Sequence, residues 1–381
     1  MVYLDNAATS FPKPPSVVAE VTRCLEEYCG NPGRGGHPLS MAAAEKIYEC
    51  REELSALFGA PDPSHVIFTQ NATAALNLAI KGLLPDGAHA IASDLEHNSV
   101  RRPLEALAAD GLISFDKISI IGDGYALDGG AICKRITTAI RKNTAAVIMT
   151  ACPNVCSLQL PIAEIGAFCR RRGILFIVDG AQAAGHFPID MRSMCIDALC
   201  LPGHKGLLGP QGSGALILGE GIMPRVIFEG GSGSSSFEAE MPREIPERYE
   251  AGTLSTPAIA GLCEGVRYIR RLGLASIEKH ERSLFLYARQ RLGSIPKVRI
   301  YMPQYAGSVL SFNVGTLPSD RVASALGTAG ICTRGGFHCN PWAHTVLGTD
   351  AHGSVRISFS PFNTPQDVDA LALALGELSR K

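Results

Sequence analysis

The sequence predicts an α/β fold with a mostly parallel sheet, helices on both of its faces, and a smaller α+β domain at the C-terminal end. Short strand-like runs alternate with helical patterns over the first half of the chain, as in parallel sheets with crossover helices. These runs are apolar throughout, which is expected of strands covered on both faces. Near residue 255 the alternation gives way to two long helical stretches followed by short strands.

The elements of the first part follow one another regularly. HVIFT (65–69) precedes a helical pattern that begins at Ala72, and HAIAS (89–93) precedes one that begins at Asn98. The run AAVIMT (145–150), the helical segment PIAEIGAFCRRRG and the run ILFIVD (174–179) continue the order, and a further strand is expected near 197–201.

The second part opens with Thr256 and Pro257, which resemble a helix N-cap followed by proline at the first helical position. Helices are expected at about 257–272 and 276–292. The strands SVLSFNV and SVRISFS follow with a helix between them, and Thr364-Pro365 opens a last helix. We expect a large domain of residues 15–255 and a small domain of residues 1–14 and 256–381, with residues 229–248 as a surface loop.

Composition sets the broad class of protein. The 381 residues are 46% hydrophobic and 19% charged, with a formal charge of −1. This is a globular composition, and it gives no charge excess that would predict a nucleic-acid or membrane partner. The start, MVYLDNAATSFP, lacks the pattern of a secretory signal, and runs such as ILFIV are too short to span a bilayer. Twelve irregularly spaced cysteines favour a reducing cytoplasm, with most of them as buried thiols.

Polar residues follow the predicted strands at the points where each strand ends. In α/β sheets, ligands bind outside these carboxyl ends. The first strand leads to Ala72 and Thr73 at a helix start, where free N–H groups can bind phosphate. Later strand ends lead to further polar residues: His97, Asn154, Asp179 with Gln182, and the pair His204-Lys205.

These residue types fit pyridoxal phosphate (PLP). The cofactor needs a lysine to hold it, an acid to keep its pyridine nitrogen protonated, donors for its phosphate and phenolic oxygen, and a flat side chain over its ring. Each residue alone is weak evidence, because an aspartate that ends a strand is usually a cap. The hypothesis depends on their falling at successive strand ends, and the roles would be filled in turn by Lys205, Asp179, Thr73, Gln182 with Asn154, and His97.

The ordered motifs resemble fold-type I, class V aminotransferase-like PLP enzymes, and within them the cysteine desulfurases of the Suf-like group. The resemblance runs nearly end to end and keeps the order of the family's motifs. The segments that carry it are YLDNAAT (3–9), RGGHPLS (34–40), SDLEHNSV (93–100), VDGAQAAGH (178–186), GHKGLLGPQGSG (203–214), YEAGT (249–253), RGGFHC (334–339) and VRISFSPFNT (355–364).

The resemblance implies roles at the cofactor. Lys205 would form the Schiff base, with His204 as a phosphate contact beside it. Asp179 would pair with the pyridine nitrogen, and His97 would stack on the ring. The phosphate and the phenolic oxygen would be held by the remaining positions: Ala72 and Thr73 for the first, Gln182 and Asn154 for the second. In a homodimer, Gly252 and Thr253 would reach the phosphate of the other subunit.

The resemblance also implies the substrate contacts and the nucleophile. His37, Asn154 and Arg334 would lie near the substrate, and Arg356 would bind its carboxylate. VRISF predicts a strand on which Arg356 and Ser358 share one face, while Val355 and Ile357 pack on the other. An arginine without an adjacent acid in the sequence is free to meet a carboxylate. The expected nucleophile is Cys339, in a mobile loop marked by Gly and Pro, where the nearby charge of Arg334 and His338 would favour the thiolate.

The activity implied is that of a cytoplasmic, homodimeric L-cysteine desulfurase. Sulfur would pass from L-cysteine to Cys339 as a persulfide, L-alanine would leave, and a protein acceptor would take the sulfur. The sequence departs from the family pattern at three positions. It has Phe337 where the family often has histidine, Asn340 where alanine is common, and Ala72 where many members have threonine. None of these departures removes a catalytic group.

Several alternatives stay open at this point. Selenocysteine lyase, a plain C–S lyase and cysteine-sulfinate desulfination use the same PLP frame. A sulfur-transfer partner without turnover is disfavoured by the intact lysine, aspartate, arginine and cysteine. A metal site is a further alternative, but its spacing matches no compact zinc motif and we expect no metal; the candidate ligands are His338, Cys339, His344 and His352.

Overall fold

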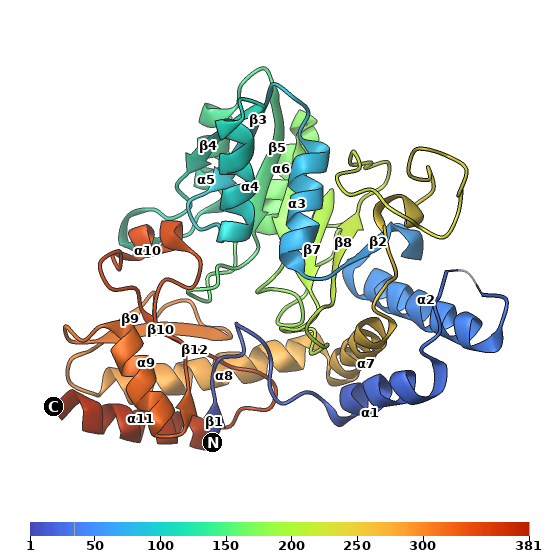
Figure 1. The fold of residues 1–381 in the computed structure, drawn as a ribbon. Coiled ribbons are helices and arrows are strands. Elements are labelled where there is room, and N and C mark those ends of the chain that lie inside the picture. Colours follow the sequence, from blue (N-terminus) through green and yellow to red (C-terminus); the bar gives the residue numbers. More distant parts are fainter. Residues whose placement is uncertain (34, 381) are drawn as a thin grey trace.

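The computed structural model describes residues 1–33 and 35–380, and it confirms the α/β fold. The larger sheet has seven strands (Figure 1). Their order is β2 (Val66–Thr69), β8 (Gly214–Leu218), β7 (Ala198–Pro202), β6 (Leu175–Asp179), β5 (Thr144–Thr150), β3 (Ala88–Ser93) and β4 (Ile113–Ile118).

Six of these strands end at the same edge of the sheet. The five from β7 to β4 pair in parallel, and β8 is antiparallel to both β7 and β2. Because β2 opposes β8, β2 runs in the direction of the parallel strands. The loops that follow β2, β3, β5, β6 and β7 therefore all leave from one edge.

Alternate side chains of the larger sheet enter two separate cores. In β6, Phe176 and Val178 join one core and Ile177 joins the other, as the two-residue period of a strand requires. The first core is covered by α2 (Pro38–Phe58), α5 (Gly129–Ala139), α6 (Ile162–Arg172) and α7 (Thr256–Leu272). The second core is covered by α3 (Ala72–Leu83) and α4 (Asn98–Ala109).

The C-terminal part forms a smaller antiparallel sheet. Its strands lie in the order β12 (Val355–Ser358), β10 (Val309–Val314) and β9 (Val298–Tyr301). Val355 and Ile357 enter the core beneath it, so the predicted alternation around Arg356 is confirmed. The helices of this core are α8 (Leu274–Gly293), α9 (Ser319–Thr328) and α11 (Pro365–Arg380).

The chain start belongs to this C-terminal part. β1 (Val2–Tyr3) pairs in parallel with β11 (Ile331–Cys332), and Asp5 forms a bridge with Ser358. Both termini accordingly lie in the same lower region of Figure 1. The remaining elements are α1 (Pro15–Arg23), the π-helical turn Cys24–Tyr28, α10 (Pro341–Leu347), and the 3-10 turns Pro63–His65, Asp123–Tyr125 and Glu247–Tyr249.

One predicted helix start is wrong by one residue. α7 begins at Thr256, which is buried, and the N-cap is Ser255, which makes no side-chain cap. The start expected at Pro365 is confirmed. Within the described ranges, no helix has both the length and the apolar character that a membrane span needs.

Candidate active site

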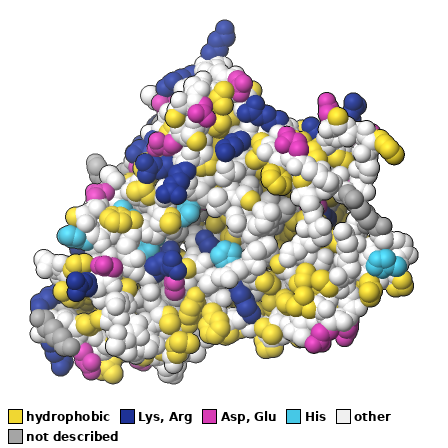
Figure 2. All heavy atoms as spheres, viewed as in Figure 1, with side chains coloured by type: hydrophobic (Ala, Val, Ile, Leu, Met, Phe, Trp, Pro, Cys, Tyr) yellow, Lys and Arg dark blue, Asp and Glu magenta, His cyan; other side chains and the backbone are white. Residues whose placement is uncertain are grey.

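The loops at the carboxyl edge of the larger sheet surround one pocket. On the face shown in Figure 2, Lys, Arg and His side chains gather around the middle, below α4. Every strand end singled out in the sequence contributes to this pocket. Its lining includes Asn71, Ala72, Thr73, His97, Asn154, Asp179, Gln182, His204, Lys205 and Asn340.

Lys205 and Asp179 form the charged centre of the pocket. Asp179 ends β6 at 2% exposure, and its Oδ1 accepts a hydrogen bond of 2.9 Å from the Ala181 amide. Burial raises the pKa of Asp179, and the Lys205 ammonium opposes this. Burial lowers the pKa of Lys205 to about 8. A larger share of this amine is therefore neutral near neutral pH, which is the form that condenses with a carbonyl.

The start of α3 forms one wall of the pocket. Asn71 caps this helix through Oδ1, which accepts from the Ala74 amide at 3.0 Å. The first N–H groups of a helix have no intrahelical partner, so those around Thr73 can bind an anion. His204 also lines the pocket, and burial lowers its pKa to about 4, so that its ring is neutral at pH 7.

His97 closes the pocket from the end of β3. It is the N-cap of α4, and its Nδ1 accepts from the Ser99 amide at 3.1 Å and lies 2.7 Å from the Ser99 hydroxyl. These contacts fix the ring. Burial lowers the pKa of His97 to about 4, and Lys205 lowers it further. A neutral, fixed imidazole is suited to packing against a flat aromatic ring.

Two buried polar atoms of the residues that line the pocket are suited to binding a polar ligand. Gln182 donates from Nε2 to the Ala7 carbonyl at 2.9 Å, but its Oε1 finds no partner among residues 1–33 and 35–380. The same holds for Nδ1 of His204. Buried polar atoms are almost always hydrogen-bonded. With the lysine, the aspartate and the helix start, these atoms fit PLP, and the predicted residues are the ones that would hold it.

Arg356 lies beside this pocket but is not free of acidic partners, contrary to our expectation. Its Nη2 donates to Asp5 Oδ1 at 3.1 Å and its Nη1 to the Asn154 carbonyl at 3.1 Å. Arg334 binds the other oxygen of Asp5 with two donors at 3.0 Å. The sequence could not show this, because Asp5 lies 351 positions from Arg356. Nε of Arg356 is buried without a partner in the described structure and remains available to a carboxylate.

Cys339 is exposed, and two hydrogen bonds connect the backbone of its loop to the larger part of the chain. The Asn98 amide donates to the Cys339 carbonyl at 2.8 Å, and Asn154 Nδ2 donates to the His338 carbonyl at 2.6 Å. The expected positive charge of His338 is wrong. Burial lowers the pKa of His338 to about 2, so the ring is neutral. Arg334 is the remaining cation of the motif, and Asp5 offsets its charge.

Some predicted site residues lie elsewhere in this chain. Gly252 and Thr253 are exposed and line two other hollows, of about 570 and 390 Å³. His37 is exposed at the start of α2, where its Nδ1 accepts from the Ser40 amide at 3.3 Å. Arg34, the first residue of the RGGHPLS segment, lies outside the described residues. Across the described ranges, no three His, Cys, Asp or Glu side chains form a group that could hold a metal ion.

The fold and the placement of Lys205 and Asp179 in one pocket define a fold-type I PLP-dependent enzyme, and the comparisons give its family. Residues 2–371 match the class-V aminotransferase family. A probable cysteine desulfurase of Methanothermobacter thermautotrophicus is 32% identical over 99% of this chain and 94% of its own. A cysteine desulfurase of Escherichia coli strain SE11 is 30% identical over 100% and 94%. The chain therefore belongs to the class-V aminotransferase family.

The solved structures agree with this assignment. The apo structure of a cysteine desulfurase from Thermococcus onnurineus NA1 is similar to this chain with a TM-score of 0.90. It is 30% identical, and the match covers 100% of this chain and 94% of the other. The likeness therefore extends through both sheets and the loops between them.

Sequence reasoning missed three residues of the site. Asp5 joins both arginines, Ser99 fixes His97, and the Asn98 amide holds the Cys339 carbonyl. All three lie in the family motifs YLDNAAT and SDLEHNSV, and that was the one signal that could have identified them. The roles of Asp5 and Asn98 depend on contacts between distant segments, which periodicity cannot reveal.

Proposed function

We propose that the protein is a PLP-dependent L-cysteine desulfurase that transfers sulfur to Cys339 as a persulfide and releases L-alanine. One observation carries the proposal. Cys339 is exposed, and its carbonyl accepts a hydrogen bond from the Asn98 amide, next to the pocket that contains Lys205 and Asp179. The relatives named above, one a probable cysteine desulfurase and the others cysteine desulfurases, support it. The intact set of lysine, aspartate, arginine and cysteine argues against a partner without turnover.

The residues of the chain divide the work. PLP supplies an electron sink when it is bound. Asp179 would hold the pyridine nitrogen in its protonated form, and Arg356 would orient the substrate carboxylate. The Lys205 amine takes the proton from the substrate Cα and later returns a proton. The Cys339 thiolate attacks the substrate sulfur, so that an S–S bond forms as the C–S bond breaks. The bonding pair stays with the substrate carbon skeleton, and protonation there completes the methyl group of alanine.

The test compares products from L-cysteine and L-selenocysteine in parallel. A desulfurase converts L-cysteine to alanine and leaves a persulfide on the enzyme. A plain C–S lyase gives pyruvate, ammonia and free sulfide from the same substrate. Strong turnover of selenocysteine with little of cysteine would instead identify a selenocysteine lyase.

Arg356→Ala is expected to raise the KM for L-cysteine by roughly 10- to 100-fold, since the charge-assisted contact that its unpaired Nε can make with the substrate carboxylate is lost. PLP should stay bound, because the variant leaves Lys205 and Asp179 in place. Arg334→Ala is the matched control: Arg334 binds the same aspartate but is half exposed, so a smaller rise is expected. Steady-state kinetics with cofactor absorbance checks both, and an unchanged KM for Arg356→Ala would place the carboxylate elsewhere.

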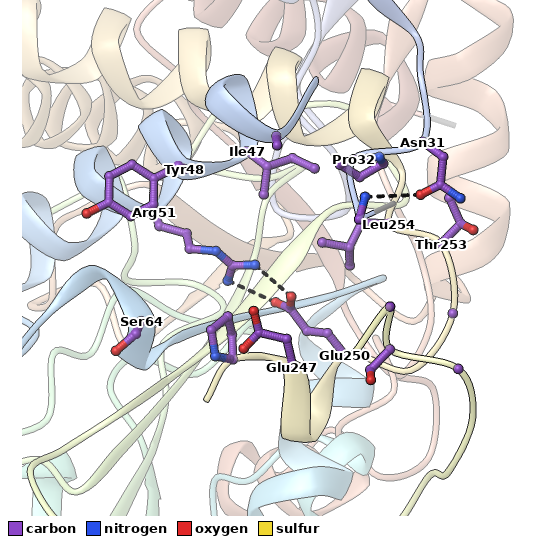
Figure 3. Close-up of a pocket in the computed structure, with 17 residues that line it drawn as sticks. Asn31, Pro32, Ile47, Tyr48, Arg51, Ser64, Glu247, Glu250, Thr253 and Leu254 are labelled. Atoms are coloured by element: carbon purple, nitrogen blue, oxygen red, sulfur yellow. Dashed lines mark hydrogen bonds and ion pairs between the residues drawn. The ribbon is translucent and has the colours of Figure 1, made fainter. Parts of the chain in front are cut away.

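The proposed enzyme is a homodimer whose active sites are shared between subunits. Gly252 and Thr253 do not line the pocket of their own chain, which supports their contact with the neighbour's phosphate. Gly252 and Thr253 instead line the pocket of about 570 Å³, beside the buried ion pair of Arg51 and Glu250 (Figure 3). Large apolar side chains are exposed on α2 and the nearby loops, as at interfaces: Leu39, Met41, Tyr48, Phe228 and Phe237. We extend the proposal to His37, which would meet substrate in the partner's site.

Co-expression of two inactive variants tests the shared site. Lys205→Ala and Thr253→Ala subunits should together recover about a quarter of the wild-type activity, because random pairing makes half of the dimers mixed and each mixed dimer keeps one intact site. Lys205→Ala co-expressed with the double variant of both positions is the control and should stay inactive. A wild-type enzyme that light scattering shows to be an active monomer would refute the arrangement.

We propose further that the enzyme works in the cytoplasm and passes its sulfur to a protein acceptor. All twelve cysteines are free, as in proteins kept reduced. The exposed position of Cys339 leaves its thiol open to a partner.

We also propose the two domains expected from the sequence, 15–255 and 1–14 with 256–381. The pairing of β1 with β11 supports this division, and α7, whose buried side chains join the larger core, connects the domains.

A further inference from the structure

The backbone that carries the nucleophile is in an unusual conformation. His338 and Cys339 have φ values of 51° and 54°, so two successive residues with side chains are left-handed. This region of conformational space is unfavourable for residues other than glycine. Such backbone persists where surrounding contacts hold it, and it is common at functional sites.

Asn340 follows these two residues directly. Its side chain is fully buried. Nδ2 donates to the Leu95 carbonyl at 2.9 Å and to Asn154 Oδ1 at 3.0 Å, while Oδ1 caps α10 by accepting from the Ala343 amide at 3.1 Å. Both donors and the acceptor of the amide are thus engaged. Alanine, the residue expected here in the family, could make none of these bonds.

These contacts join the two parts of the chain. Cys339 lies on the segment between β11 and β12 of the smaller part. Leu95 and Asn154 follow β3 and β5 of the larger sheet, and both line the pocket. Trp342 adds a second contact between α10 and the larger sheet, because its ring centroid lies 6.3 Å from that of Phe115 on the edge strand β4. The cysteine is therefore positioned by the pocket that contains Lys205.

We propose that Asn340 is a positioning residue whose two donated hydrogen bonds keep the Cys339 thiol at the substrate sulfur, so that cleaved sulfur is captured as persulfide and not released as sulfide. The inference rests on the proposed function. In the captured route, the S–S bond forms as the C–S bond breaks and alanine results. Without capture, elimination followed by hydrolysis converts cysteine and water to pyruvate, ammonia and sulfide, with no change of oxidation state at sulfur.

Two variants separate the hydrogen bonds from the helix cap. Asn340→Ser keeps an oxygen that can cap α10 but loses the bonds to Leu95 and Asn154, and Asn340→Ala loses all three. Asp128→Ala is the matched control, because Asp128 caps α5 through the same kind of bond, 3.1 Å from the Ala131 amide, on the exposed surface. The measurements on the holoenzymes are kcat, KM, PLP content and the ratio of alanine to pyruvate.

Both Asn340 variants should lower the kcat for alanine roughly 10- to 100-fold, the cost of displacing a reacting group by about 1 Å. The pyruvate share should rise, while KM and PLP content stay close to those of the wild type. Asp128→Ala should change none of these. If Asn340→Ala does not fold, Asn340→Ser decides. Unchanged kcat and product ratio in Asn340→Ser, or loss of PLP from both variants, would overturn the inference. Pyruvate as the main product of the wild type would instead refute the proposed function.

Discussion

Lys205→Ala is expected to lower turnover of L-cysteine by about 10³-fold or more, because both the covalent hold on PLP and the acid–base group are lost. Burial that lowers the pKa of this amine to about 8 makes Lys205 suited to both tasks. Borohydride reduction of the wild-type holoenzyme, followed by peptide mapping, should place the pyridoxyl group on Lys205.

Lys13 provides a demanding control for this experiment. Burial lowers its pKa to about 8 as well, and its Nζ donates to the carbonyl of His204 at 3.0 Å, one residue from Lys205. Its amine also donates to Ser10 Oγ at 2.7 Å, and Lys13 does not line the pocket. Lys13→Ala should therefore keep the cofactor. A pyridoxyl label on Lys13, or wild-type protein that takes up no PLP, would overturn the assignment of Lys205.

Cys339→Ser should reduce alanine formation from L-cysteine by about 100-fold or more, since a hydroxyl cannot accept the sulfur as a persulfide. The absorbance of bound PLP should be retained, because Lys205 and Asp179 remain. Activity on L-selenocysteine should be largely kept, because the weaker C–Se bond can break without the thiol.

Cys29→Ser is the matched control, because Cys29 and Cys339 are both exposed cysteines. It should behave as the wild type with either substrate. If Cys339→Ser retained its rate with L-cysteine and produced pyruvate, the enzyme would be a plain lyase. The same assays distinguish this result from a loss of cofactor, which would lower the activity with both substrates equally.

Much of the fold could be predicted because it is encoded locally. The apolar run ILFIVD and its neighbours identify strands buried on both faces, and the cores on the two sides of β6 explain why these strands show no alternation. The reversed direction of β8 could not be predicted, since a short apolar run does not encode the direction of its pairing. The predicted start of α7 was wrong by one residue. Thr256, expected to cap the helix, is instead its buried first residue.

In the candidate site too, features that depend on local sequence could be predicted and features that depend on distant contacts could not. Asp179 ends β6 and Lys205 follows β7, and the rule for the carboxyl ends of parallel strands brings them together. The pairing of Asp5 with Arg334 and Arg356 depends on a contact across most of the chain, which no local pattern reveals. The neutral state of His338 depends on burial, so the sequence suggested a cation where the structure has none.

The central claim is that Cys339 accepts the sulfur, and peptide mass spectrometry tests it most directly. Wild-type holoenzyme would be mixed with one equivalent of L-cysteine, alkylated at once and digested. We predict a persulfide adduct on the peptide that contains Cys339, together with an equal amount of alanine, while Cys29 is alkylated as an ordinary thiol. Turnover of L-cysteine to alanine with Cys339 always alkylated as an unmodified thiol would contradict the account.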